Sequence, residues 1–212
     1  MIITCWSVKG GSGTTVVAAT LGLISAKRSP TLLVDLAGDV PAALGLPDAP
    51  GPGVGDWLDS GADRRALKAL ERVGGTSLGL LPAGHPSTAS GDPLADALAA
   101  DGRTIIVDAG VVRAGPSFDL AAAATTSLLV VRGCYLALRR AAAAPLRPSG
   151  VVFVNEPGRT LTKRDIETVL GIPVVAEVEL DPAVARAVDA GLLACRLPRS
   201  LERALRSSEV RV

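Results

Sequence analysis

The chain has 212 residues, which suits one well-buried domain over residues 1–212 and is short for two. A formal net charge of +1 argues against a strongly basic nucleic-acid binder, and no apolar run approaches the roughly 20 residues that span a bilayer. The cysteines (Cys5, Cys134 and Cys195) are odd in number and lack Cys-x-x-Cys spacing, which is typical of reduced thiols. We therefore expect a cytoplasmic protein without a signal peptide.

Short apolar runs without polar alternation predict strands that are buried on both faces. The predicted strands are 2–8, 31–36, 78–84, 103–110, 127–133, 150–156 and 172–178. The predicted helices are 15–28, 54–73, 92–101, 117–126, 134–143, 162–169, 182–190 and 199–208. Because strands and helices alternate, we expect an α/β fold with a doubly wound, mostly parallel sheet of seven or eight strands and helices on both faces. Residues 44–55, dense in Pro and Gly, predict a surface loop.

Ligands of such open sheets bind beyond the carboxyl ends of the strands. The residues at or just after the carboxyl ends of the predicted strands are therefore the candidates for a site. They are 9–15, 35–39, 108–110 and Asn155.

The first predicted strand leads into a glycine-rich segment and then into a helix, which is the context of a phosphate-binding loop. Its glycines let backbone N–H groups turn inward, and the N-terminus of the following helix favours an anion. A Walker A loop reads G-x-x-x-x-G-K-[ST], and here Thr14 stands where the lysine belongs. A turn without a ligand is the alternative. The candidate nucleotide-binding residues are Lys9, Gly10, Gly11, Ser12, Gly13, Thr14 and Thr15.

Several segments together resemble the MinD/ParA superfamily of SIMIBI-class ATPases, whose deviant Walker A loop reads x-K-G-G-x-G-K-[ST]. VKGGSGTTVVAATLGL resembles that loop, TLLVDLAGDVPAALGL the second strand and switch I, RTIIVDAG the Walker B strand, and GVVFVNEPGR the adenine-contacting segment. The similarity covers nearly the whole chain in the family's order and implies a P-loop NTPase-like fold. The spacing in DLAGDVPAALGL is closest to the TadZ/CpaE branch, whose ATPase-like domain helps to localise a type IV-like (Tad/Flp) pilus machine.

The resemblance implies ATP and Mg²⁺ as ligands and a role for each matching residue. Lys9 matches the signature lysine, which reaches the nucleotide of the facing subunit and so implies a homodimer. Thr15 matches the hydroxyl that binds Mg²⁺, and Asp108 the Walker B carboxylate that holds it through water. Asp35 matches the first acidic residue of switch I. Asn155 matches the adenine-binding amide, with a turn-capping role as the alternative.

Two departures from the family pattern affect the chemistry and leave open whether the chain is an enzyme. Thr14 replaces the loop lysine, and Ala37 occupies the place of the second switch I aspartate, which positions the attacking water. Since phosphoryl transfer depends on positioning and on charge stabilisation, their joint loss is expected to slow hydrolysis on the order of 10³-fold. Asp39 is a candidate substitute for the missing carboxylate.

The C-terminal stretch 195–212 is locally basic. Five arginines (Arg196, Arg199, Arg203, Arg206 and Arg211) face two glutamates (Glu202 and Glu209). The apolar face of this segment is small and lacks an aromatic anchor. We therefore expect a last helix packed on the domain with a solvated basic side, and peripheral membrane contact is the alternative. His85, the single histidine, is expected to be a loop residue.

These patterns favour a degenerate, dimeric P-loop protein that localises or assembles a pilus or secretion machine, is recruited to the membrane or cell pole through partners, and binds ATP weakly or not at all. The dimer is expected to form through apolar contacts around residues 37–46 and 110–118. One alternative is an active ATPase in positioning or septum-site selection, with Lys9, Asp35 and Asp39 as catalytic candidates. A metabolic P-loop relative is the other, although the cysteines lack the spacing of iron–sulfur ligands.

Overall fold

The computed structural model describes residues 1–47 and 50–206. Its strands form one sheet in the order β3-β4-β2-β5-β1-β6-β7-β8, in which β3 pairs antiparallel with β4 and every other pairing is parallel. The strands are β1 (Ile2–Ser7), β2 (Thr31–Asp35), β3 (Arg72–Gly75), β4 (Leu78–Leu81), β5 (Thr104–Val111), β6 (Thr126–Arg132), β7 (Gly150–Asn155) and β8 (Val174–Glu179).

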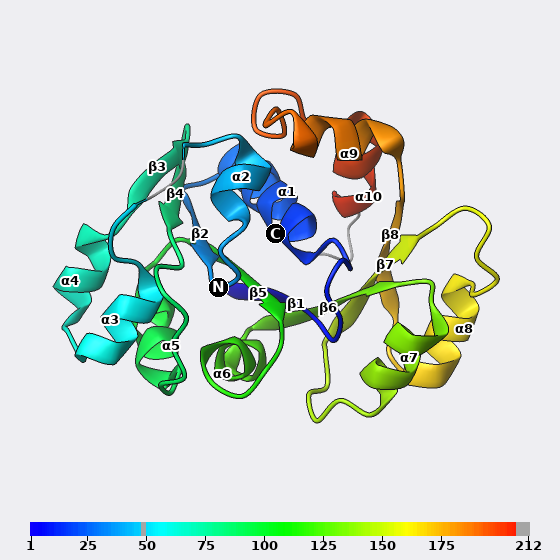
Figure 1. The fold of residues 1–212 in the computed structure, drawn as a ribbon, viewed down its shortest axis with the longest axis horizontal. Helices are drawn as coiled ribbons and strands as arrows, with labels where there is room; N and C mark the ends of the chain where they lie inside the picture. Colours follow the sequence, from blue (N-terminus) through cyan, green and yellow to red (C-terminus); the bar gives the residue numbers. More distant parts are fainter. Residues whose placement is uncertain (48–49, 207–212) are drawn as a thin grey trace.

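Helices cover both faces of the sheet (Figure 1). One layer holds α1 (Thr14–Ala26), α2 (Val40–Leu44), α9 (Pro182–Asp189) and α10 (Arg199–Leu205). The other holds α3 (Val54–Ser60), α4 (Arg64–Ala69), α5 (Asp92–Ala99), α6 (Pro116–Ala123), α7 (Tyr135–Ala142) and α8 (Lys163–Leu170). The predicted doubly wound, P-loop NTPase-like α/β fold is therefore confirmed, with eight strands.

The central strands are buried on both faces, which explains their continuous apolar sequences. In β1, Ile3 and Cys5 join the core beneath α1 and α10, whereas Ile2 and Trp6 join the two clusters on the opposite face. All seven predicted strands are present within a few residues of their predicted ends. Strands with no solvent-facing side hold mostly apolar residues, and a polar side chain within them needs a partner, as the Thr4 hydroxyl finds in the Leu120 carbonyl (3.1 Å).

The structure corrects the predicted helix 54–73. Gly61 ends α3, the Asp63 side chain accepts a hydrogen bond from the Ala66 N–H and starts α4, and Arg72–Gly75 form β3 instead of a last helical turn. The short helix α2 was also not predicted. It begins after Asp39 and lies just before the predicted loop 44–55.

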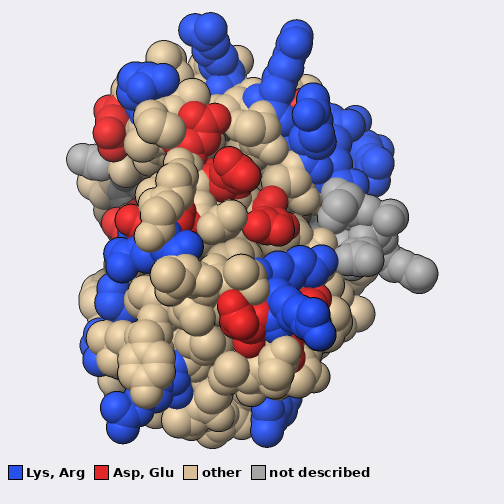
Figure 2. Space-filling view, turned by 90° about the vertical axis from the view of Figure 1, so that its right-hand side faces the viewer, with Lys and Arg blue, Asp and Glu red and all other residues tan. Residues whose placement is uncertain are grey.

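The last described helix packs on the domain, as predicted. Leu201 and Leu205 of α10 are buried in the core with α1, and Glu202 pairs with Lys27 at the end of α1 (2.6 Å) and with Arg206 (2.7 Å). Figure 2 shows Lys and Arg side chains gathered on the upper part of one face of the molecule. The apolar face of α10 is therefore not available to a membrane. Arg211 and Glu209 lie outside the described residues.

Within the described chain, no helix is both long and apolar enough to cross a bilayer.

Packing of α10 predicts a measurable stability cost for Leu205→Ala. Truncating a fully buried leucine removes apolar contacts and leaves a cavity, so we expect a loss of about 2–5 kcal/mol in the free energy of unfolding. Urea unfolding followed by the fluorescence of Trp6 and Trp57, both buried, measures it. Val169→Ala, on the exposed side of α8, is the control and should change stability by about 0.5 kcal/mol or less. Equal stability of the two variants would contradict the packing of α10.

Candidate phosphate-binding site

A cavity of about 750 Å³ opens at the carboxyl ends of β1, β2 and β5. Its walls include residues 10–16, 36–39, 83–88 and 109–111. The predicted site residues that line it are Gly10, Gly11, Ser12, Gly13, Thr14, Thr15 and Asp39. The predicted site residues that do not line it are Lys9, Asp35, Asp108 and Asn155. Most of the predicted constellation therefore meets at one edge of the sheet.

The glycine-rich segment adopts the shape of an anion-binding loop. Gly11 and Gly13 have φ angles of 74° and 89°, which side chains with a Cβ rarely adopt. The Ser12 hydroxyl donates to the Lys9 carbonyl (2.7 Å), and α1 starts directly after Gly13. A Cβ placed on Gly10 or Gly11 would meet no atom within 4 Å, so the outer surface of the loop has room for a ligand. The loop and the helix N-terminus fit a phosphate group.

Thr14 and Thr15 begin α1 at the inner end of the loop. Thr14 is 7% exposed and offers a neutral hydroxyl where a lysine would bring a charge. Thr15 is half-buried, lines the cavity and lies close enough to Asp108 to affect its ionisation. The loop therefore presents backbone dipoles and hydroxyl groups to a ligand, but no cation from α1.

Lys9 makes its hydrogen bonds through its backbone carbonyl and not through its side chain. Its carbonyl accepts hydrogen bonds from the Ser7 hydroxyl (3.2 Å) and the Ser12 hydroxyl (2.7 Å). Among the described residues, none forms a hydrogen bond or ion pair with its ammonium group, and Lys9 does not line the cavity. The ammonium is thus not committed to the phosphate site of its own chain.

Asp108, at the cavity end of β5, is a buried carboxylate that is only half satisfied. Oδ1 accepts a hydrogen bond from the Gly110 N–H (3.0 Å), whereas Oδ2 has no partner among the described residues. Burial raises the pKa of Asp108 to about 7, with a smaller contribution from Asp35, and the Thr15 hydroxyl opposes the rise. An unpartnered buried oxygen beside a threonine hydroxyl suits a hard cation such as Mg²⁺.

A cation at this position would draw most of its ligands from water and phosphate. Within residues 1–47 and 50–206, no group of three or more His, Cys, Asp or Glu side chains is arranged to hold a metal ion. Asp108 and Thr15 would supply one carboxylate and one hydroxyl. Such a sparse protein contribution is typical of Mg²⁺ bound together with a nucleotide.

The Asp35 carboxylate is used within the fold. It accepts hydrogen bonds from the N–H groups of Ala37 (2.9 Å), Gly38 (2.7 Å) and Val40 (3.1 Å), and so organises the segment that leads into α2. Burial raises its pKa, and these three donors oppose the rise. Ala37 lines the cavity with a methyl group, which leaves Asp39 as the exposed carboxylate in that segment.

Asn155 ends β7 outside the cavity lining, and its amide donates to Glu177 (3.1 Å). Its role as an adenine contact stays a prediction. Next to it lies Arg132, which the sequence analysis did not single out and which falls within the predicted strand 127–133. Arg132 donates to the Gly11 carbonyl (3.2 Å) and pairs with Glu156 (2.8 Å), which ties the end of β6 to the phosphate loop.

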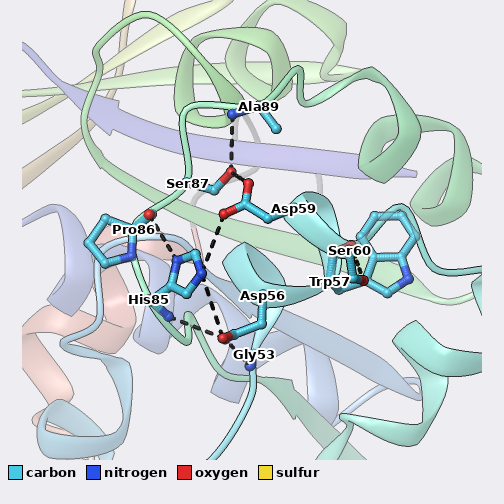
Figure 3. A network of polar contacts seen from close by, with 9 residues as sticks. All are labelled: Gly53, Asp56, Trp57, Asp59, Ser60, His85, Pro86, Ser87 and Ala89. Carbon is cyan, nitrogen blue, oxygen red and sulfur yellow. Dashed lines mark hydrogen bonds and ion pairs between the residues drawn. The ribbon is translucent and has the colours of Figure 1, made fainter.

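His85 is an exposed loop residue, as predicted, but it also lines the cavity opposite the phosphate loop. Figure 3 shows its ring between two carboxylates of α3, with Nε2 3.3 Å from Asp59 and 3.7 Å from Asp56. The Pro86 carbonyl, 2.9 Å from Nδ1, is the main cause that raises the pKa of His85, and both carboxylates add to the rise. The position directly after the strand 78–84 was a usable signal for this residue.

The cysteines form no common site. All three are free thiols: Cys5 is buried in β1, Cys134 precedes α7 and accepts a hydrogen bond from the Ala137 N–H (3.4 Å), and Cys195 is exposed. This arrangement offers no cluster ligands and argues against an iron-protein relative.

No protein-family model and no curated protein matches the chain. Its fold is similar to several solved structures. The cell division ATPase MinD of Pyrococcus furiosus matches with a TM-score of 0.78 and 21% identity, over 99% of this chain and 97% of that one. The ParA family ATPase of Chlorobium tepidum matches with a TM-score of 0.76 and 20% identity, over 100% and 99%. MinD of Pyrococcus horikoshii, solved with Mg-ADP, matches with a TM-score of 0.76 and 20% identity, over 96% and 91%. At this identity the likeness establishes the fold.

The raised pKa of Asp108 predicts a pH-dependent gain in stability for Asp108→Asn. From its ordinary value of 3.8 up to about 7, the unfolded chain releases the proton that the folded chain keeps, so the parent loses stability as the pH rises through this window. The asparagine variant has no proton to lose. We expect it to be more stable than the parent by up to a few kcal/mol at pH 8, at about 1.4 kcal/mol per pKa unit, and by much less at pH 5.

Urea unfolding of parent and variant at both pH values measures this difference. Asp96→Asn, an exposed carboxylate on α5, is the control and should show no comparable dependence. A stability difference for Asp108→Asn that stays constant between pH 5 and pH 8 would contradict the raised pKa.

Proposed function

We propose that this chain is a MinD/ParA-like P-loop protein that binds ATP with Mg²⁺ weakly, hydrolyses it poorly and acts as a dimeric localisation or assembly factor. The observation that carries the proposal is the backbone of a phosphate loop, with Gly11 and Gly13 in the left-handed region just before α1. At position 14, where such a loop has a lysine, this chain has a threonine. The unpartnered Asp108 oxygen beside Thr15 supports a metal ion at the same place.

Weak hydrolysis follows from the groups that face the cavity. Ala37 offers no carboxylate, and both oxygens of Asp35 are engaged by backbone N–H groups. Water activation would therefore fall to Asp39, which is exposed in the cavity lining. That exposure is the one observation that favours the alternative, an active ATPase. Against it stands the replacement of the loop lysine by Thr14, because charge stabilisation carries most of phosphoryl transfer.

In a homodimer whose subunits face each other across the phosphate loops, Lys9 would have a function. Its ammonium group is not committed to its own cavity, and face-to-face C₂ pairs are the commonest oligomers. The loops expected to supply apolar contacts, 37–46 and 110–118, hold none of the large exposed apolar side chains in the described part of the chain. Tyr135 and Leu136, exposed at the start of α7, offer apolar surface at the carboxyl edge of the sheet instead.

The cellular setting that we propose is a Tad/Flp pilus or a related secretion machine, whose proteins would recruit the chain to the membrane or a cell pole. Support for this setting is the switch-region spacing in residues 35–46, which resembles the TadZ/CpaE branch. MinD of Aquifex aeolicus, another protein of similar fold, was solved in a complex with MinC, so folds of this kind do support protein partners.

Thr14→Lys is expected to strengthen ATP binding. A lysine at this position would add a charge-assisted hydrogen bond of about 1.5–3 kcal/mol, which is roughly a tenfold to hundredfold decrease in Kd. Calorimetric titration with Mg·ATP and Mg·ADP measures affinity, and single-turnover hydrolysis of both proteins measures chemistry. Sub-micromolar binding by the parent that Thr14→Lys does not improve would count against a degenerate loop. Rapid hydrolysis by the parent would favour the active ATPase.

Lys9→Ala is expected to weaken dimerisation in Mg·ATP. If the ammonium group contacts the nucleotide of the facing subunit, its removal leaves phosphate charge uncompensated at the interface. Light scattering at tens of micromolar protein, with and without Mg·ATP, measures the mass. The control is Lys163→Ala, which removes an exposed lysine at the start of α8. A parent that stays monomeric in both conditions would refute the dimer, and a dimer unaffected by Lys9→Ala would refute the role of Lys9.

A further inference from the structure

Three ionisable side chains line the cavity beside the phosphate loop: Asp39, His85 and Arg113. A polyphosphate bound against the loop would bring several negative charges into this space. Thr14 supplies no compensating charge, and Lys9 does not line the cavity. Among the described residues that line the cavity, His85 and Arg113 are the ones that can carry a positive charge.

His85 is poorly suited to this role because its charge is already compensated. Its ring lies between the Asp56 and Asp59 carboxylates, as Figure 3 shows, and its other nitrogen faces the Pro86 carbonyl. Asp59 is itself held by the Ser87 hydroxyl (2.5 Å). A protonated His85 thus belongs to a locally balanced network between α3 and the loop after β4.

Arg113 is placed differently. Its backbone is fixed by Ser117, whose hydroxyl donates to the Arg113 carbonyl (3.0 Å) and accepts from the Arg113 N–H (3.1 Å). The residue before it, Val112, donates its N–H to the Ser7 carbonyl at the end of β1 (2.9 Å), so this turn is tied to the strand that carries the phosphate loop.

The Arg113 side chain has no bonding partner among the described residues. It is exposed, and within the described residues it forms neither a hydrogen bond nor an ion pair. Arginines elsewhere in the fold, such as Arg103 and Arg132, are paired with carboxylates. Arg113 thus lines the cavity with a fixed backbone and with a guanidinium group that no described residue pairs, which is an arrangement that a ligand can complete.

We propose that Arg113 is the phosphate-binding cation of this site and replaces the charge that a loop lysine would bring. A guanidinium group presents a planar fork of N–H donors that matches phosphate oxygens and keeps its charge at any physiological pH. The ligand class is therefore a Mg²⁺-bound polyphosphate, held by the loop backbone and by Arg113. This inference rests on the proposed function and adds a residue that the sequence resemblance does not assign.

Arg113→Gln tests the proposal, because glutamine keeps much of the length of the side chain and removes the charge. Calorimetric titration of the full chain with Mg·ATP, and separately with magnesium tripolyphosphate, is expected to show affinity reduced about tenfold or more for both ligands. Arg113→Lys should keep most of the affinity. The control Arg65→Gln, an exposed arginine on α4 outside this cavity, should bind like the parent. Thermal unfolding of each variant checks that the fold is intact.

A double variant sharpens the result. If Arg113 compensates for the missing lysine, adding Thr14→Lys to Arg113→Gln restores binding, and Arg113→Gln costs less in the Thr14→Lys background than in the parent. A parent that binds both ligands while Arg113→Gln binds them equally well would overturn this inference and leave the proposed function standing. A loss with ATP but not with tripolyphosphate would also overturn it. A parent that binds neither ligand at millimolar concentration would overturn the proposed nucleotide binding, and Arg113 with it.

Discussion

The in-register pairing of β2, β5 and β1 is the constraint on which the rest of the structure depends. Asp35 lies opposite Asp108, and Asp108 lies opposite Cys5 at the approach to the phosphate loop. Because these strands are covered on both faces, their carboxylates lie toward the carboxyl ends, and parallel pairing brings those ends to one edge. The position of the candidate site thus follows from the way the sheet buries its apolar residues.

Two neighbouring carboxylates at this edge, Asp35 and Asp108, differ in how fully they are hydrogen-bonded. The Asp35 carboxylate has a structural role: it accepts hydrogen bonds from three backbone N–H groups and so fixes the segment before α2. Asp108 is equally enclosed but keeps one oxygen without a partner among the described residues. In native proteins a buried polar atom without a protein partner is commonly paired with an ordered water or an ion. The contrast locates the feature that a ligand would satisfy at Asp108 rather than at Asp35.

The strands and the loop were predictable from the sequence because their signals are local. Continuous apolar runs marked seven strands, and the glycines marked the phosphate loop. β3 was missed because Arg72–Gly75 includes two glycines and lacks an apolar run. Its antiparallel pairing with β4, and not its own sequence, makes this segment a strand. The break in helix 54–73 had a usable signal in Gly61 and Asp63, a helix stop followed by an N-cap residue. Contacts of Arg132 and His85 depend on chain packing, which one sequence does not reveal.

In our proposal two cations near the loop have separate roles. One holds the ligand in the cavity, and the other acts on a facing subunit. Lys9 has no side-chain partner among the described residues and does not line the cavity, whereas Arg113 lines that cavity from a turn tied to β1. A cation within the cavity acts on ligand affinity, and a cation beside it is free to act on a facing subunit. This arrangement supports our proposal of a protein that responds to a bound polyphosphate without hydrolysing it rapidly.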